Sequence, residues 1–440
     1  MSALLDIARA AVELARKKGA SDAVASAHRS REVELGFRDG RVEKTSEATT
    51  RALSMALYVD GRYSAVSTSD LRPEALSSFL DESIAMARTL AKDPYRALPD
   101  PALYAGRASV DLRIFDPKHE SVTPDVRIRM AREMEQAARS VKGAESIISV
   151  TTGASDSHVQ RARFSSNGFE GEIEQTSFWL SADVTVKDPD GRKPEEWWSA
   201  GARAFADLPS PADIGRTAAE RALATIGSKK TESAVLPLVI ENRSAGRLIS
   251  ALLGPLGGRA LQQKQSFLEG KLGTAIAAKL LTLTDDPHLP GGFGSRLWDS
   301  DGIASKRLPI IENGVLKAYF VDDYYGRKLK MAPTTASASN LVFAPGKKDL
   351  AALLADVKEG VLVTGFLGGN SNATTGDYSF GIQGFRIRGG KKAEPVSETN
   401  IAGNQRDLWK KLAAVGSDPW RFSSTRAPTL VFEGVQLAGA

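Results

Sequence analysis

The chain has 440 residues, of which 42% are hydrophobic and 25% are charged, and its formal net charge is +5. This length and composition are typical of a soluble globular protein with two or three domains. Lysine and arginine are spread along the chain and no apolar run approaches ~18 residues, so neither direct nucleic-acid binding nor a transmembrane helix is expected.

Cysteine is absent, which excludes disulfides, thiolate metal sites and cysteine nucleophiles. The four histidines are far apart in the sequence and none forms an HExxH-type pair, so a zinc site within this chain is not expected. The first predicted element is an amphipathic helix over residues 2–18, and it contains Asp6, Arg9 and Glu13. Charges in that region argue against a signal peptide, and we expect a cytoplasmic protein.

An N-terminal domain of hairpins and helices is predicted over residues 1–104. Alternating apolar residues run up to Asp39-Gly40 and again up to Asp60-Gly61. Asp-Gly between alternating runs predicts a β-hairpin, because a type I′ turn needs positive φ. A second helix is expected to begin near Pro73, and a proline-rich linker follows it.

A central α/β segment is predicted over residues 105–230. It is expected to begin with a helix capped at Thr123 and to end with a helix whose apolar residues align from Ile214 to Ile226. Between the two helices, alternation predicts strands around residues 147–150, 158–164 and 178–186.

Residues 231–440 are predicted to form a larger domain rich in antiparallel sheet. The helices are grouped among hairpins and do not alternate with single strands, so the fold class is predicted to be α+β. The expected elements are a strand at 235–240, a helix at 245–253, a hairpin at Asn313-Gly314 returning to Phe320, glycine-rich strands, a helix from Asn404 through Leu412 and Val415, and a last strand at 429–437.

The segment Gly365–Trp409 combines frequent glycine with an alternation of aromatic and aliphatic residues, as in Tyr378, Phe380 and Ile382. Glycine inside a strand marks a bulge or a close approach by another backbone or by a ligand. Two interpretations stay open. A ligand lies across this sheet, or the sheet is twisted and tightly turned without one.

Eight stretches together resemble the TldD/PmbA family, specifically its PmbA branch, which is also called TldE. No single stretch is very specific, but their order and spacing cover nearly the whole chain. The stretches are Arg38–Leu76, Asp93–Pro101, Ser165–Gly171 (SSNGFEG), Lys264–Gly273, Asp285–Ile303, Thr374–Phe385 (TTGDYSFGIQGF), Pro395–Asn404 and Ala427–Gly439.

The resemblance implies a cytoplasmic protein that pairs with a TldD-type subunit. In that family the TldD subunit is a zinc metallopeptidase with an HExxxH helix. The pair trims or degrades unstructured peptides, including microcin precursors and antitoxins. The family also carries an older label, modulator of DNA gyrase, which this chemistry does not explain.

The resemblance also implies that this branch lacks the zinc site. The two histidine positions of HExxxH fall at Ile240 and Ala245, neither of which offers a lone pair to zinc. Glu241 and Asn242 lie near the position of the catalytic glutamate, which without a metal has no water to activate. TldD also uses a C-terminal cysteine as a ligand, and this chain has none. We therefore expect no metal and no cofactor in this chain, and zinc in the TldD-type partner.

The best candidate for peptide binding lies in the glycine-rich segment, which in this family borders the interdomain cleft. Strand addition suits unfolded substrates because backbone hydrogen bonds do not depend on sequence. Asp377 or Ser379 could hold a terminus or a side chain. Alternatively, Asp377 caps a turn and Ser379 faces solvent. The candidate residues are Thr375, Gly376, Asp377, Tyr378, Ser379 and Gly381.

Three other features have both a functional and a structural interpretation. Asp299 and Asp301 form either an acidic pair or a structural loop anchored by Trp298. Gly291–Gly294 resembles a phosphate loop only superficially, because no strand precedes it and no GK[ST] follows. Trp197-Trp198 forms either a partner surface or packing over a sheet.

The leading functional hypothesis is a non-catalytic subunit of a heteromeric TldD/TldE metallopeptidase that acts on unfolded peptides. The first alternative is a homodimeric peptide-binding or adaptor protein without peptidase activity. The second is a regulator of DNA gyrase, which the absence of basic clusters disfavours as a direct DNA binder.

Overall fold

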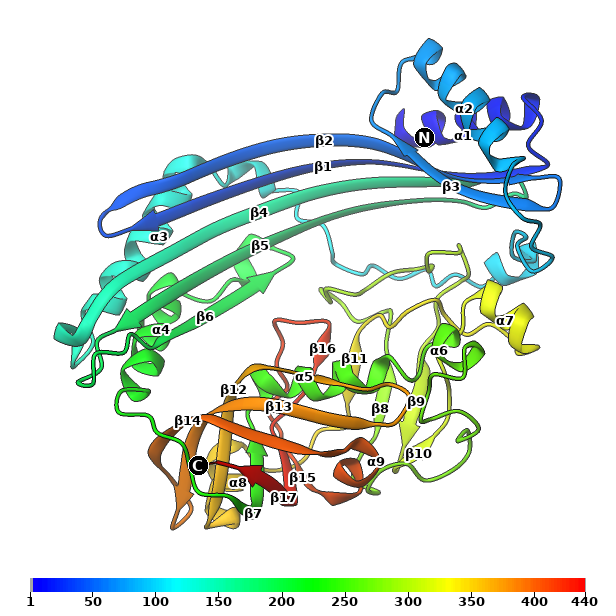
Figure 1. Ribbon diagram of the computed structural model, residues 1–440. Helices are drawn as coiled ribbons and strands as arrows, with labels where there is room; N and C mark the ends of the chain where they lie inside the picture. Colours follow the sequence, from blue (N-terminus) through cyan, green and yellow to red (C-terminus); the bar gives the residue numbers. More distant parts are fainter. Residues whose placement is uncertain (1–2, 440) are drawn as a thin grey trace.

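The computed structural model describes residues 3–439 and confirms the predicted α+β class (Figure 1). A long, curved sheet built from residues 22–202 arches over a lobe built from residues 234–438. The predicted N-terminal domain (residues 1–104) and central segment (residues 105–230) each contribute three strands to this one sheet. The boundaries near residues 104 and 230 stay a prediction. No helix among residues 3–439 is both long and apolar enough to cross a membrane.

The N-terminal sheet is antiparallel, with strand order β3-β2-β1-β4-β5-β6. Its turns at Asp39 and Asp60 have φ values of 47° and 52°, as the Asp-Gly signals predicted. The separate strands predicted around 147–150 and 158–164 are wrong, because one strand spans both. Residues 151–157 are mostly small and polar, but β1 and β5 pair them on both sides. The strands are β1 (Asp22–Arg38), β2 (Arg41–Val59), β3 (Arg62–Thr68), β4 (Ile147–Ser165), β5 (Glu170–Val186) and β6 (Glu195–Ala202).

Helices cover one face of this sheet at its two ends. Ala27 and Leu35 lie on the same side of β1, since they are an even number of residues apart. Ala27 packs in the cluster with α1 and α2, and Leu35 packs in the cluster with α3 and α4. The start predicted at residue 2 lies outside the described residues. The helices are α1 (Ala3–Lys17), α2 (Pro73–Ala87), α3 (Pro124–Arg139) and α4 (Pro211–Ala224), with short 3₁₀ turns at Pro101–Tyr104, His119–Ser121, Ala144–Ser146 and Phe205–Asp207.

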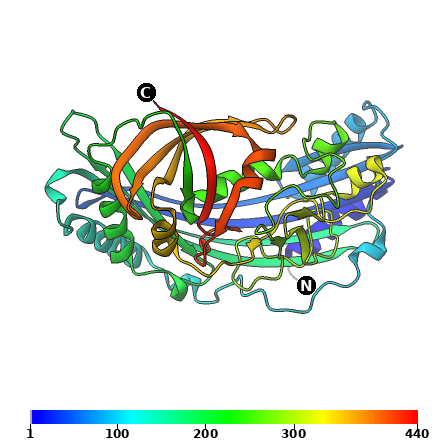
Figure 2. The same cartoon turned by 90° about the horizontal axis from the view of Figure 1, so that it is seen from below.

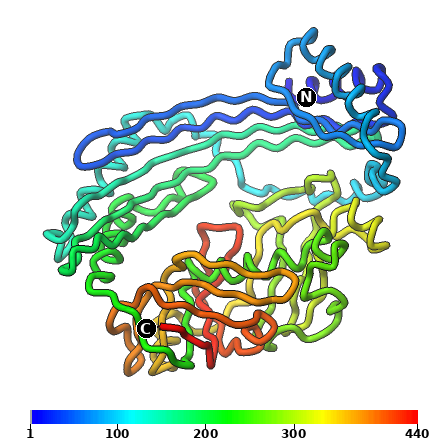
Figure 3. Tube along the Cα trace, in the orientation of Figure 1, coloured from blue at the N-terminus to red at the C-terminus, as the bar shows by residue number. Residues whose placement is uncertain are grey.

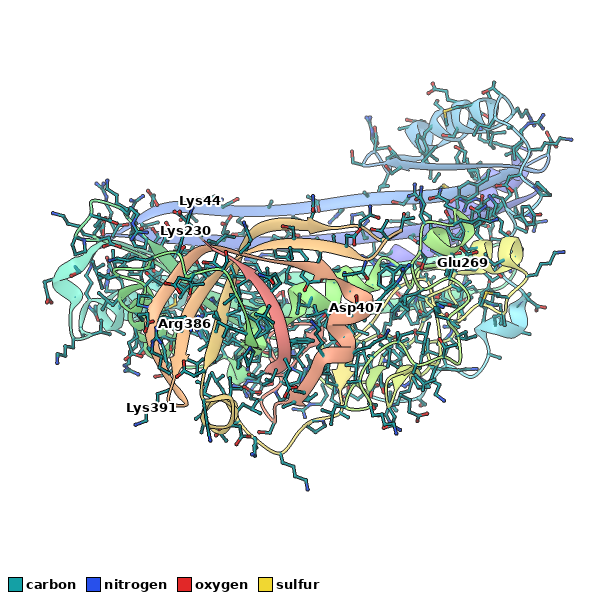
Figure 4. The ribbon with its side chains drawn as sticks, turned by 60° about the horizontal axis from the view of Figure 1, so that its bottom comes forward. Lys44, Lys230, Glu269, Arg386, Lys391 and Asp407 are labelled. Atoms are coloured by element: carbon teal, nitrogen blue, oxygen red, sulfur yellow. The ribbon has the colours of Figure 1, made fainter. Side chains whose placement is uncertain are left out.

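The opposite face of the N-terminal sheet is turned toward the C-terminal lobe, which lies across the long strands when seen from below (Figure 2). Residues 225–233 carry the chain from α4 into that lobe (Figure 3). Along β2, residues 41–51 are exposed, and Lys44 marks this stretch in Figure 4. This part of β2, which β3 does not pair, is therefore an accessible edge of the N-terminal sheet.

The main sheet of the C-terminal lobe closes on itself. Its order is β14-β13-β12-β7-β17-β15, and β14 also pairs with β17 through Ile401 and Leu437. Inward-facing side chains such as Phe380 and Phe432 belong to the largest core cluster. The strands are β7 (Ala234–Ile240), β12 (Gly360–Ser371), β13 (Asp377–Arg388), β14 (Lys391–Asn404), β15 (Leu412–Val415) and β17 (Leu430–Ala438).

The helix predicted from Asn404 through Val415 is wrong beyond its first turns. It ends as α9 (Gln405–Leu408) and a 3₁₀ turn at Trp409–Lys411. Leu412 and Val415 have helical spacing from Leu408, but both are buried because β15 pairs with β17. Long-range pairing therefore overrode the local pattern.

A smaller sheet, of order β10-β9-β8-β11-β16, completes the lobe. The hairpin predicted at Asn313-Gly314 is confirmed, but its return strand ends at Leu316 and does not reach Phe320. The remaining elements are α5 (Asn242–Leu253), α6 (Gly258–Gln262), β8 (Leu283–Asp285), β9 (Leu308–Glu312), β10 (Val315–Leu316), α7 (Asp323–Leu329), β11 (Leu341–Phe343), α8 (Leu350–Val357) and β16 (Thr425–Arg426).

Aromatic contacts dock the loop after β8 onto the N-terminal sheet. Phe293 stacks on Trp179 of β5 with ring centroids 4.9 Å apart. Trp298 packs edge-on against Phe169 at 5.8 Å and lies over Gly171, where an added Cβ would come within 2.9 Å of the indole. Glycine at position 171 thus allows the two lobes to approach closely.

Candidate functional site

The predicted peptide-binding residues lie in the turn between β12 and β13 and at the start of β13. The carboxylate of Asp377 accepts hydrogen bonds from Thr375 Oγ1 at 2.7 Å and from Asn404 Nδ2 at 2.9 Å. These two bonds lower the pKa of Asp377. Gly376 has a φ of +87°, which the turn requires. The acidic side chain thus stabilises the turn while staying exposed to solvent.

The next residues alternate between core and surface. Tyr378 is buried and stacks on Phe380 at 5.5 Å, and burial raises the pKa of its hydroxyl to about 12. Ser379 is exposed. Both edges of β13 are paired here, since Ser379 lies between Asn370 of β12 and Ala402 of β14. In this conformation the segment offers side chains, and no free strand edge, to a ligand. Its role in peptide binding stays a prediction.

Close backbone approach inside the sheet accounts for glycines of the segment. An added Cβ at Gly384 would lie 1.8 Å from the carbonyl oxygen of Leu362. At Gly369, where β12 bulges, it would lie 2.1 Å from the carbonyl oxygen of Ser379. At these positions the protein itself, without any ligand, requires glycine.

Helix α5 begins where the resemblance locates the zinc-binding helix. Ile240 and Ala245 are both completely buried in the hydrophobic core. No group of three or more His, Cys, Asp and Glu residues that could hold a metal ion occurs within residues 3–439. The donor set of this helix therefore does not fit a metal.

An ionic cluster joins α5 to the N-terminal sheet. The members are Arg221 of α4, Glu196 of β6, and Glu241 and Arg243 at the start of α5. Arg221 Nη1 donates to Glu241 Oε1 at 2.8 Å, and Arg243 Nη2 donates to Glu196 Oε2 at 3.1 Å. The side chains of Arg243 and Glu196 are only 6% and 2% exposed. The charges are thus paired within the joint between the lobes.

Burial and charge act on the two arginines of this cluster in different proportions. Burial lowers the pKa of Arg221, but the hydrogen bond and charge of Glu241 outweigh it and raise the pKa overall. Burial lowers the pKa of Arg243, and the nearby charge of Arg221 lowers it further. Arg243 also lies 4.6 Å from the ring centre of Trp197. The tryptophan pair therefore contributes to packing at the joint, although Trp197 remains partly exposed.

Asp299 has a structural role in its loop. Its Oδ1 accepts backbone hydrogen bonds from Asp301 and Ile303, and its Oδ2 accepts one from Ala336 at 3.0 Å. Burial and the charge of Asp301 raise the pKa of Asp299. These bonds support the interpretation of a structural loop.

A cavity of about 530 Å³ lies between the N-terminal sheet and the loop that carries Phe293 and Trp298. The walls of this cavity come from segments far apart in the chain, so local sequence patterns do not reveal it. The arginines on its walls include Arg161 and Arg163, two residues apart on β4 and therefore on the same face. The spacing of Arg161 and Arg163 within a strand indicates a shared face, but nothing in the sequence places Arg296 opposite them.

Three family models match the chain in order. They are described as PmbA/TldA metallopeptidase domain 1 at residues 23–87, central domain at 117–226 and C-terminal domain at 233–439. Metalloprotease PmbA from Escherichia coli O157:H7 is 30% identical, over 92% of this chain and 90% of its own length. A PmbA homolog from Haemophilus influenzae is 29% identical, over 98% of this chain and 94% of its own.

Solved structures agree with these relatives. A Bacteroides thetaiotaomicron protein described as a candidate modulator of DNA gyrase has a TM-score of 0.95 and 41% identity, and covers 99% of this chain and 98% of its own. TldE from Thermococcus kodakarensis has a TM-score of 0.87 over 98% of this chain and 100% of its own. At 20% identity that likeness supports the fold alone. The chain belongs to the PmbA/TldD metallopeptidase family, within its PmbA, or TldE, branch.

Proposed function

We propose that this chain is the non-catalytic subunit of a two-protein metallopeptidase that acts on unfolded peptides in the cytoplasm. The observation that carries the proposal is the composition of the segment from the end of β7 to the first turn of α5. The family name implies a catalytic metal, yet Ile240 and Ala245 are buried apolar residues at the two histidine positions. Glu241 and Arg243 at the start of α5 pair with Arg221 of α4 and Glu196 of β6. Zinc would then belong to a TldD-type partner.

In this proposal the chain helps to form the substrate chamber and stabilises its partner. The turn containing Thr375, Gly376 and Asp377 would contact the peptide through side chains, together with Ser379. Tyr378 and Gly381 would shape the strand beneath them. Microcin precursors and antitoxins are the kinds of unstructured peptide that the resemblance suggests.

Mixing experiments test the proposal. The purified chain alone should not cleave an unfolded fluorogenic peptide, and addition of a TldD-type protein from the same organism should produce hydrolysis above that of either protein alone. Sedimentation velocity should show a heteromeric species. A stable homodimer that does not bind the TldD-type protein, together with no gain in hydrolysis, would instead support an adaptor role.

A further inference from the structure

The cavity between the lobes is lined by arginines without carboxylate partners. Among residues 3–439, Arg161, Arg163 and Arg296 form no ion pair within 4.0 Å, although all three line the cavity. Arg221 and Arg243, which also lie at the joint between the lobes, each pair with a glutamate. We call Arg161, Arg163 and Arg296, with the hydroxyls beside them, the arginine pocket.

Arg163 is the best-enclosed member of the arginine pocket. Its Nη1 donates to Ser26 Oγ at 3.4 Å, and its Nε is closed off from solvent without an acceptor. Burial lowers the pKa of Arg163, and the more distant charges of Asp301 and Asp299 oppose that effect. Because a buried cation without a hydrogen-bonded counter-charge is costly, an anion in the cavity would stabilise it.

Arg296 approaches from the C-terminal lobe. Its guanidinium donates to Thr335 Oγ1 at 3.1 Å and to Ser337, while its Nε lacks an acceptor. The acidic residue on the cavity wall, Asp299, already uses both carboxylate oxygens for backbone amides. The wall therefore has uncompensated positive charge from both lobes.

Arg203 provides an internal comparison. Within the described part of the chain it also has no carboxylate partner, and burial lowers its pKa to about 10. Its two Nη atoms, however, donate to the backbone carbonyls of Thr176 at 3.1 Å and Phe293 at 2.7 Å. Arg203 thereby connects the loop to the sheet, whereas Arg161 and Arg163 bond to no carbonyl or carboxylate of residues 3–439.

We propose that the arginine pocket binds a carboxylate of the peptide substrate. Guanidinium groups pair with carboxylates through charge-assisted, often bidentate hydrogen bonds. Hydroxyls of Ser54 and Ser300 line the same cavity and can donate to the same group. Phe293 and Trp298 supply apolar walls for the part of the peptide next to the bound carboxylate. The inference rests on the proposed function, and it names the chemistry by which this subunit holds its substrate.

Three versions of one unstructured ten-residue peptide identify the group that is bound. The first has a free C-terminal carboxylate, the second is C-terminally amidated, and the third is amidated but contains one Glu. Fluorescence anisotropy with the full chain should give at least tenfold tighter binding for the first or the third than for the second. Tighter binding of the first peptide would indicate recognition of the C-terminal carboxylate. Tighter binding of the third would indicate recognition of an acidic side chain.

Substitutions test the location. Arg163→Gln should abolish the preference for a carboxylate, and Arg163→Lys should restore part of it. Arg161→Gln changes an exposed side chain on the same wall. It should also weaken the preference for a carboxylate, and it keeps the test valid if Arg163→Gln does not fold. Arg51→Gln removes an equal charge from the exposed part of β2 and should leave binding unchanged.

Equal affinity for all three peptides, or binding of a single-stranded oligonucleotide but of no peptide, would overturn the assignment. The same peptides in the mixed complex separate the two proposals. If the rate of hydrolysis depends neither on the carboxylate nor on Arg163→Gln, the arginine pocket is rejected and the proposed function is retained. Carboxylate-dependent binding without any gain in hydrolysis rejects the proposed function alone.

Discussion

Asp377 has a structural role that its sequence context anticipated. The side chain bonds to Thr375 and Asn404 across the turn, so the capping interpretation accounts for the aspartate without a ligand. Ser379 and the exposed face of the turn remain open to a peptide. Capping and binding are compatible here, because a rigid turn presents its remaining polar groups in fixed positions.

Burial of Tyr378 predicts a specific response to alkaline pH. The folded pKa of about 12 lies above the unfolded value near 10, so the unfolded chain ionises first and stability falls as pH rises between these values. The loss should approach about 1.4 kcal/mol per pH unit. Urea unfolding at pH 8, 10 and 11 should therefore show a smaller decline for Tyr378→Phe than for the parent.

Tyr95→Phe is the matched control, because Tyr95 is 40% exposed. Its pH dependence should follow that of the parent protein. Identical declines for Tyr378→Phe and the parent would show that the buried hydroxyl does not titrate as described.

At the scale of elements, two glycines should respond oppositely to alanine. Gly246 lies inside α5 with no atom within 4 Å of an added Cβ, so Gly246→Ala should stabilise the protein by about 0.5–1 kcal/mol. At Gly384 the Cβ would collide with β12, so Gly384→Ala should cost about 2 kcal/mol or more. Chemical denaturation measures both, and a stabilising Gly384→Ala would refute the close approach of β12 and β13.

The joint between the lobes should depend strongly on Glu196. Removing this carboxylate leaves Arg243 buried without its 3.1 Å partner, so Glu196→Ala should lower the free energy of unfolding by about 3 kcal/mol. Glu195→Ala changes the exposed neighbour and should cost less than about 0.5 kcal/mol. Equal, small losses in urea unfolding for both variants would show that the cluster does not stabilise the joint.

For the whole molecule, short sequence patterns predicted many of the turns and strands of the fold, but they did not predict the cavity. The Asp39-Gly40 and Asp60-Gly61 turns were correct because four adjacent residues determine a hairpin turn. The continuous β4 and the strand at Leu412–Val415 were missed because partners far along the chain decide them. For the same reason, Arg163 and Arg296, which are 133 positions apart, could not be placed in one cavity.

The peptide segment was located from alternation and glycine spacing, both local properties. Its exposure and turn geometry agree with a surface feature, but the pairing of β13 on both edges depends on β12 and β14. Local alternation is therefore enough to place the segment on a strand, but whether that strand has a free edge depends on residues far along the chain.

The most direct test of the account is zinc-dependent hydrolysis of an unfolded peptide by the purified chain and by its mixture with a TldD-type partner. The chain alone, supplied with zinc, should show no hydrolysis above buffer, and the mixture should show hydrolysis that a chelator abolishes and that saturates at a fixed ratio of the two chains. Chelator-sensitive cleavage by the purified chain alone would contradict the assignment of a non-catalytic subunit.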